Sequence, residues 1–130
     1  MSRVLPAGTL IARLAELPEG ITREFALDES EFPLTGFLLR VGDAVHAYLN
    51  RCPHALRQLN FLPDRFLTPD GTLIRCCSHG ALFEKDTGLC VAGPCAGESL
   101  RRLPVVLADG EIRLTEDLDT ERLDRRPFLP

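Results

Sequence analysis

The stretch RCCSHGALF, Arg75 to Phe83, places two adjacent cysteines and a histidine at the end of an apolar, strand-like run. A second stretch with the same residue types, Cys52-Pro53-His54, follows an earlier run of this kind. Each stretch offers one thiol and one imidazole, spaced as C-x-x-H and C-x-H. Such a ligand set suits zinc or an iron–sulfur cluster. The two stretches therefore predict a metal site built from two loops, with four ligands: Cys52, His54, Cys76 and His79.

The composition is that of an ordinary globular protein, with 45% hydrophobic and 26% charged residues and a net charge of −4. Lys85 is the only lysine, so we expect no binding to nucleic acid or to an anionic membrane. No apolar run approaches a membrane span, and the first residues do not form a secretory signal. We therefore expect a cytoplasmic protein, in which the five cysteines are free or bound to metal rather than paired in disulfides.

Short runs in which apolar residues alternate with polar ones recur along the chain, as is typical of half-buried strands. They span residues 21–27, 37–41, 45–49, 103–107 and 112–114. A Gly-Asp or an Asp-Gly pair joins successive runs twice, which predicts tight hairpins. Only residues 12–17 look helical, and Pro18 ends that turn. The pattern predicts an all-β fold, an antiparallel β-sandwich or partly open barrel.

The length of 130 residues predicts a single domain, residues 1–130. Within it, cysteine, histidine and proline replace the strand alternation over residues 51–83. This predicts a small, loop-built subdomain that binds the metal group and is carried by the β framework. Residues 116–130 are polar and mixed in charge, which predicts a C-terminal surface arm.

Three segments carry a resemblance to a known family: Cys52-Pro53-His54, Cys76-x-x-His79-Gly80 and Gly93-Pro94. On these segments the sequence resembles the Rieske [2Fe–2S] family, over roughly residues 10 to 115. The resemblance implies that Cys52 and Cys76 hold the inner iron of a [2Fe–2S] cluster as thiolates. It implies that His54 and His79 hold the outer iron near the surface, and that Gly93-Pro94 belongs to a loop that shields the cluster.

The resemblance also predicts the redox potential. Two imidazoles in place of two thiolates make the site less negative, which raises the potential into the range of about −150 to +300 mV. High-potential members have Ser and Tyr hydroxyls beside the cluster, where this chain has Ala81 and Phe83. Arg57 and Ser78 occupy the positions of the disulfide that links the two loops in respiratory members. We therefore expect a potential of about −150 mV or somewhat below.

The function implied is that of a soluble one-electron carrier, a ferredoxin, rather than a catalyst by itself. It would accept electrons from a flavin-dependent reductase and pass them to a terminal oxygenase or dioxygenase, by transient docking over His54 and His79. A detached Rieske domain of an oxygenase is a variant of this hypothesis. The alternative from a different class is a zinc-stabilised Cys₂His₂ binding module without redox activity.

The remaining cysteines and one histidine are predicted to lie outside the ligand set. Cys77 is expected to be a bystander, although a ligand swap with Cys76 stays open. Cys90 and Cys95 are expected to be free thiols that fill small spaces, with a disulfide or a second metal site as alternatives. His46 is expected on the surface of a strand.

Overall fold

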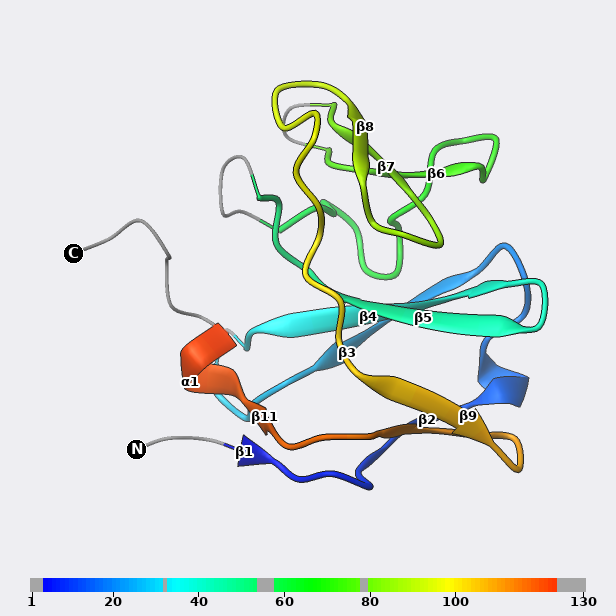
Figure 1. Ribbon diagram of the computed structural model, residues 1–130, viewed down its shortest axis with the longest axis vertical. Coiled ribbons are helices and arrows are strands. Elements are labelled where there is room, and N and C mark those ends of the chain that lie inside the picture. The colour runs from blue at the N-terminus through cyan, green and yellow to red at the C-terminus, as the bar shows by residue number, and fades with distance from the viewer. Residues whose placement is uncertain (1–3, 32, 54–57, 78–79, 124–130) are drawn as a thin grey trace.

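The computed structural model of the chain (Figure 1) describes residues 4–31, 33–53, 58–77 and 80–123. Most of its regular elements are short strands. They are β1 (Val4–Leu5), β2 (Leu10–Arg13), β3 (Thr22–Ala26), β4 (Thr35–Val41), β5 (Ala44–Leu49), β6 (Leu73–Arg75), β7 (Leu82–Glu84), β8 (Cys90–Ala92), β9 (Val105–Ala108), β10 (Glu111–Leu114) and β11 (Leu118–Asp119). Two helical segments of one turn accompany them, a 3₁₀ helix at Leu14–Glu16 and α1 at Thr120–Leu123.

The strands form four small antiparallel sheets, and the sheets do not close into a barrel. Three have three strands, in the orders β3-β4-β5, β2-β10-β9 and β6-β7-β8, and β1 pairs with β11. Figure 1 shows β3-β4-β5 across the middle, β6-β7-β8 above it, and β2 and β9 below. The predicted all-β, antiparallel fold is therefore confirmed.

Two hydrophobic clusters fill the interior, and strands β4 and β5 contribute to both. Phe37 and Leu39 of β4 point to the cluster that contains the β6-β7-β8 sheet. Leu38, between them, points to the cluster that contains β2 and β10, together with Ala47 and Leu49 of β5. Because side chains alternate along a strand, β4 is buried on both faces, rather than on one face as predicted.

The two predicted hairpins form at the expected turns. Gly42 and Asp43 join β4 to β5, with Val41 opposite Ala44. Gly42 has a φ of 60°, which is the conformation that the first position of a type II′ turn requires. Asp109 and Gly110 join β9 to β10 and have φ values of 53° and 74°, as in a type I′ turn.

The predicted helical turn over residues 12–17 is only partly right. Ala12 belongs to β2 and lies opposite Ile112 of β10. The helix is a single 3₁₀ turn, Leu14–Glu16, and it ends before Pro18. Pairing with β10 satisfies the backbone of Ala12 in the sheet, so this tertiary contact outweighs a weak local preference for helix.

The segment after residue 116 differs from the expected surface arm as far as residue 123. β11 pairs with β1, which places Leu118 opposite Leu5. Leu118 and Leu123 are each only 7% exposed and belong to the cluster around β2 and β10. In a charged segment, two leucines five residues apart do not form a pattern that predicts burial. Residues 124–130 lie outside the described residues.

The packing of the loop-built part extends beyond its predicted boundary at Phe83. Cys90, Cys95 and Leu100 are buried in the same cluster as Phe83. Strand β8, which starts at Cys90, pairs with β7. No helix in the described part of the chain is long and apolar enough to span a bilayer.

Candidate cluster site

The two cysteines of the predicted ligand set lie at the ends of two strands on the same side of the molecule. Cys52 follows β5 and Cys76 follows β6. Both are completely buried and belong to one hydrophobic cluster. His54 and His79, like Arg57 and Ser78, lie outside the described residues, so their predicted roles stay predictions. Among the described residues, no group of three or more His, Cys, Asp or Glu side chains is arranged to hold a metal ion.

Backbone hydrogen bonds tie the two cysteine loops together. The N–H of Cys77 donates to the carbonyl oxygen of Leu59 (2.7 Å), which joins the second loop to the first. Within the second loop, the N–H of Cys76 donates to the carbonyl oxygen of Ala81 (2.9 Å), and the N–H of Gly80 donates to that of Cys76 (2.8 Å). The second loop is therefore a closed turn whose position is fixed relative to the first.

A buried asparagine anchors the first loop to the sheet. Asn50, which is 1% exposed, precedes the cysteine loop, and its Oδ1 accepts the N–H of Leu59 (2.8 Å). Its Nδ2 donates to Asn60 Oδ1 (2.9 Å), to Thr35 Oγ1 (3.0 Å) and to Glu24 Oε2 (3.1 Å). Asn60 Nδ2 in turn donates to Glu24 Oε1 (2.9 Å). Both ends of the loop are thus held by one polar network.

A second contact holds the chain just beyond that network. Asp64 Oδ1 accepts the N–H of Glu24 (2.7 Å), and the carbonyl oxygen of Asp64 accepts the hydroxyl of Thr22 (2.5 Å). Asp64 has a φ of 60°, a conformation that a non-glycine residue adopts at some cost. The hydrogen bonds to β3 offset this cost and fix the way the first loop returns to β6.

The loop that carries Gly93 and Pro94 packs directly against the second cysteine loop. A Cβ at Gly93 would lie 2.8 Å from the Cα of Ala81. Gly93 also has a φ of 97°. Only glycine allows both this conformation and this approach, so the position of Gly93 follows from the backbone of Ala81.

Three cysteine side chains lie close together beneath this loop. The Sγ atoms of Cys90 and Cys95 are 2.8 Å apart, and Cys95 also interacts with Cys52. Burial, and then the neighbouring Cys90 and Cys52, raise the pKa of the Cys95 thiol. Cys90 and Cys95 are free thiols in the structure, as predicted. Cys77 is half-buried and does not belong to the buried cluster that contains these three cysteines.

His46 lies on β5, as predicted, but it is half-buried and contacts Arg102. Its Nδ1 lies 2.8 Å from a nitrogen of Arg102, whose other terminal nitrogen bonds the carbonyl oxygen of Asp86. Tyr48 donates its hydroxyl to the carbonyl oxygen of Lys85 (2.9 Å). Burial, and then the Arg102 charge, lower the pKa of His46, while burial raises the pKa of Tyr48 to about 12. The contacts of His46, Tyr48 and Arg102 attach the β7–β8 turn to β5.

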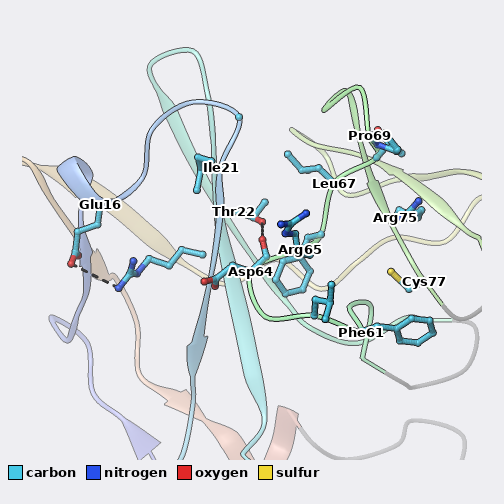
Figure 2. Close-up of a pocket in the computed structure, with 15 residues that line it drawn as sticks. Glu16, Ile21, Thr22, Phe61, Asp64, Arg65, Leu67, Pro69, Arg75 and Cys77 are labelled. Carbon is cyan, nitrogen blue, oxygen red and sulfur yellow. Dashed lines mark hydrogen bonds and ion pairs between the residues drawn. The ribbon is translucent and has the colours of Figure 1, made fainter.

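A cavity of about 690 Å³ opens beside the first loop (Figure 2). Phe61 and Leu62, which are 72% and 61% exposed, lie on its rim. Arg65, Arg75 and Cys77 also line it. Cys52 and Cys76 are not among its lining residues, so this cavity is separate from the cysteine pair.

The site thus consists of buried cysteines, two loops joined by a hydrogen bond, and a glycine loop that packs against the second of them. The model of the Rieske [2Fe-2S] domain family matches residues 8–114. The chain belongs to this family. A comparison with curated proteins found no significant match.

Solved structures with this fold include a ferredoxin, a complex of an oxygenase with a ferredoxin, and a terminal oxygenase. The ferredoxin of carbazole 1,9a-dioxygenase from Nocardioides aromaticivorans IC177 is 27% identical, with a TM-score of 0.65 over 85% of this chain and 98% of that one. A complex of reduced oxygenase and oxidized ferredoxin in carbazole 1,9a-dioxygenase is 22% identical, with a TM-score of 0.64 over 85% and 94%. The terminal oxygenase of carbazole 1,9a-dioxygenase from Novosphingobium sp. KA1 is 24% identical, with a TM-score of 0.66 over 88% of this chain and 30% of that one.

The cofactor of this Rieske domain is a [2Fe–2S] cluster, and the described residues fit it. The cluster needs thiolates in a site that excludes water. Cys52 and Cys76 are fully buried thiols on two loops that share a hydrogen bond. The shielding loop predicted at Gly93-Pro94 lies against Ala81, five residues after Cys76.

The residues that hold the site are those that the sequence motif did not include. The motif does not indicate Asn50, Glu24 or Asn60, although Asn50 stands two residues before Cys52. An asparagine at the end of a hydrophobic strand is an available signal, since a buried amide must find partners. Its partner Glu24 comes from another strand, which no local pattern indicates.

Proposed function

We propose that this Rieske ferredoxin-like chain is a one-electron carrier that delivers electrons to a terminal oxygenase. Cys52 and Cys76 would hold the inner iron as thiolates, and His54 and His79 the outer iron. The observation that carries the proposal is the pair of fully buried thiols on two hydrogen-bonded loops. The bound cluster supplies a site that takes up and releases one electron. A cytoplasmic location is part of the proposal.

The chain's own residues keep water away from the two cysteines. The hydrophobic cluster around Cys52 and Cys76 includes Phe37, Phe66 and Ile74, so thiolates there are stabilised by metal rather than by water. Electrons would enter and leave at the histidine side, by transient docking of a flavin-dependent reductase and then of the oxygenase. Similarity to a ferredoxin of a dioxygenase system supports the oxygenase as a partner.

The experiment that tests the proposal measures iron and acid-labile sulfide in the anaerobically purified chain, with electron paramagnetic resonance after reduction. We expect iron and sulfide in equal amounts and a rhombic signal with a low average g value. Stoichiometric zinc without sulfide would instead support the structural binding module. A chain that holds neither iron nor sulfide after reconstitution would overturn the proposal.

The adjacent cysteines offer a matched pair of variants for the ligand assignment. Cys76→Ser is expected to lose most of the cluster, since a buried hydroxyl is a poor replacement for a thiolate. Cys77→Ser is expected to keep the iron and sulfide content of the unchanged chain, because Cys77 is half-buried and lies at the separate cavity. Loss of iron in Cys77→Ser, with retention in Cys76→Ser, would reassign the ligand to Cys77.

Ala81 tests the predicted low potential. It is fully buried, and its carbonyl accepts the N–H of Cys76. Ala81→Ser is expected to raise the potential by about 40 mV, the equivalent of one hydrogen bond of about 1 kcal/mol to a sulfur that becomes more negative on reduction. Redox titration measures the shift, with Ala26→Ser, an exposed position at the end of β3, as the control. Equal potentials in Ala81→Ser and Ala26→Ser would show that Ala81 does not lie beside the cluster.

A further inference from the structure

Cys90 and Cys95 are two buried thiols that the proposed ligand set does not use. Cys90 begins β8, and Cys95 follows Gly93-Pro94 in the loop against Ala81. Their side chains belong to residues that are 2% and 1% exposed. Their Sγ atoms are 2.8 Å apart, closer than the length of an ordinary hydrogen bond between two thiols but longer than a disulfide of about 2.05 Å.

Backbone hydrogen bonds hold the two cysteines in this arrangement. The N–H of Cys90 donates to the carbonyl oxygen of Glu98 (2.7 Å), and the N–H of Gly97 donates to that of Cys90 (3.1 Å). The N–H of Glu98 donates to the carbonyl oxygen of Cys95 (2.9 Å). The thiols therefore face each other because the loop is closed on itself, and a small movement of sulfur would join them.

We propose that Cys90 and Cys95 are a reversible redox pair that closes to an intrachain disulfide when a peroxide oxidises it. One thiol loses its proton, and its thiolate sulfur attacks one oxygen atom of hydrogen peroxide. The O–O bond breaks, which gives a sulfenic acid and a hydroxide that takes up the proton and leaves as water. The second thiol attacks the sulfenic sulfur, the S–S bond forms and a second water leaves. Two thiols and one peroxide thus give one disulfide and two waters, and a dithiol reductant reverses the change.

This pair is better placed for the reaction than any other pair of the chain's cysteines. Cys52 also interacts with Cys95, but a sulfur that ligates iron is not available to attack a peroxide. Cys77 lines the separate cavity and lies on the second cysteine loop. The disulfide would fix the loop of Gly93 against Ala81. Oxidation would therefore stabilise the loop that covers the second cysteine loop.

The test uses the holoprotein, treated with increasing hydrogen peroxide, quenched in acid, alkylated and digested with trypsin. The tryptic peptide of residues 86–101 contains Cys90 and Cys95 and no other cysteine. We expect this peptide to change from doubly alkylated to unalkylated and lighter by two hydrogen atoms, while the visible absorption of the cluster persists. Dithiothreitol before alkylation should restore the doubly alkylated form.

Two variants keep the test independent of folding effects. Cys77→Ser should form the cross-link at the same peroxide concentration as the unchanged chain. Cys90→Ser should leave Cys95 as a single alkylated or sulfenic site. The proposal is overturned if the 86–101 peptide stays doubly alkylated at peroxide concentrations that oxidise Cys77, if Cys95 joins Cys52 instead, or if dithiothreitol cannot open the bond.

Discussion

Asn50→Ala is expected to lower the free energy of unfolding by about 3 kcal/mol, the largest effect of any single polar substitution near the site. The variant removes the acceptor for the buried N–H of Leu59 and the donor for Glu24. Each buried group left without a partner costs about 1–3 kcal/mol. Because the network holds both ends of the first cysteine loop, the cluster should also be lost more rapidly. Urea unfolding and the rate of bleaching measure the two effects.

Asn60→Ala is the matched control for Asn50. Asn60 contacts the same carboxylate of Glu24 (2.9 Å) but is half-buried, so water can replace the lost hydrogen bond. We expect a loss of about 1 kcal/mol or less. If the two variants were equally stable, the buried amide of Asn50 would not anchor the loop.

Gly93→Ala is expected to displace the loop that covers the second cysteine loop. The new Cβ would meet the Cα of Ala81 at 2.8 Å, and a backbone atom cannot move aside as a side-chain end can. The positive φ adds a cost of about 1–2 kcal/mol. Together these should destabilise the chain by about 3 kcal/mol and expose the cluster to solvent. Unfolding in urea and the rate of bleaching under air measure both consequences.

Gly97→Ala separates the cost of the positive φ from the cost of the contact with Ala81. Gly97 lies in the same loop with a φ of 92°, but a Cβ there would meet nothing within 4 Å. Its substitution should cost only the backbone strain, about 1–2 kcal/mol, and leave the bleaching rate unchanged. Equal bleaching rates in the two variants would show that the contact of Gly93 with Ala81 does not protect the cluster.

The sequence predicted those parts of the fold that depend on local patterns. The turns at Gly42-Asp43 and Asp109-Gly110 were found because few residues tolerate the backbone conformations that tight hairpins need. The one-sided burial of β4 was wrong, since the apolar Leu38 between Phe37 and Leu39 only makes sense when a second cluster covers the other face. Ile21, the first residue of the alternating run 21–27, lies just before β3 and is 50% exposed.

The sequence indicates the candidate ligands but not the residues that support them. Cys52 and Cys76 stand in short motifs, and both are buried in the structure. Asn50 follows β5 and Glu24 belongs to β3, and only the folded sheet brings them together. The approach of Gly93 to Ala81 is likewise a tertiary contact, and no periodicity or spacing in the sequence predicts it.

Strands β4 and β5 form the shared wall of two hydrophobic compartments. One compartment carries the cysteine loops, and the other holds β1, β2, β10 and the C-terminal turn. Substitutions that change the compartment of Cys52 and Cys76 affect alternate side chains of that wall, and the intervening side chains continue to pack against the other compartment. A scaffold divided in this way can accommodate changes in loop length or in potential without a matching change on its opposite side.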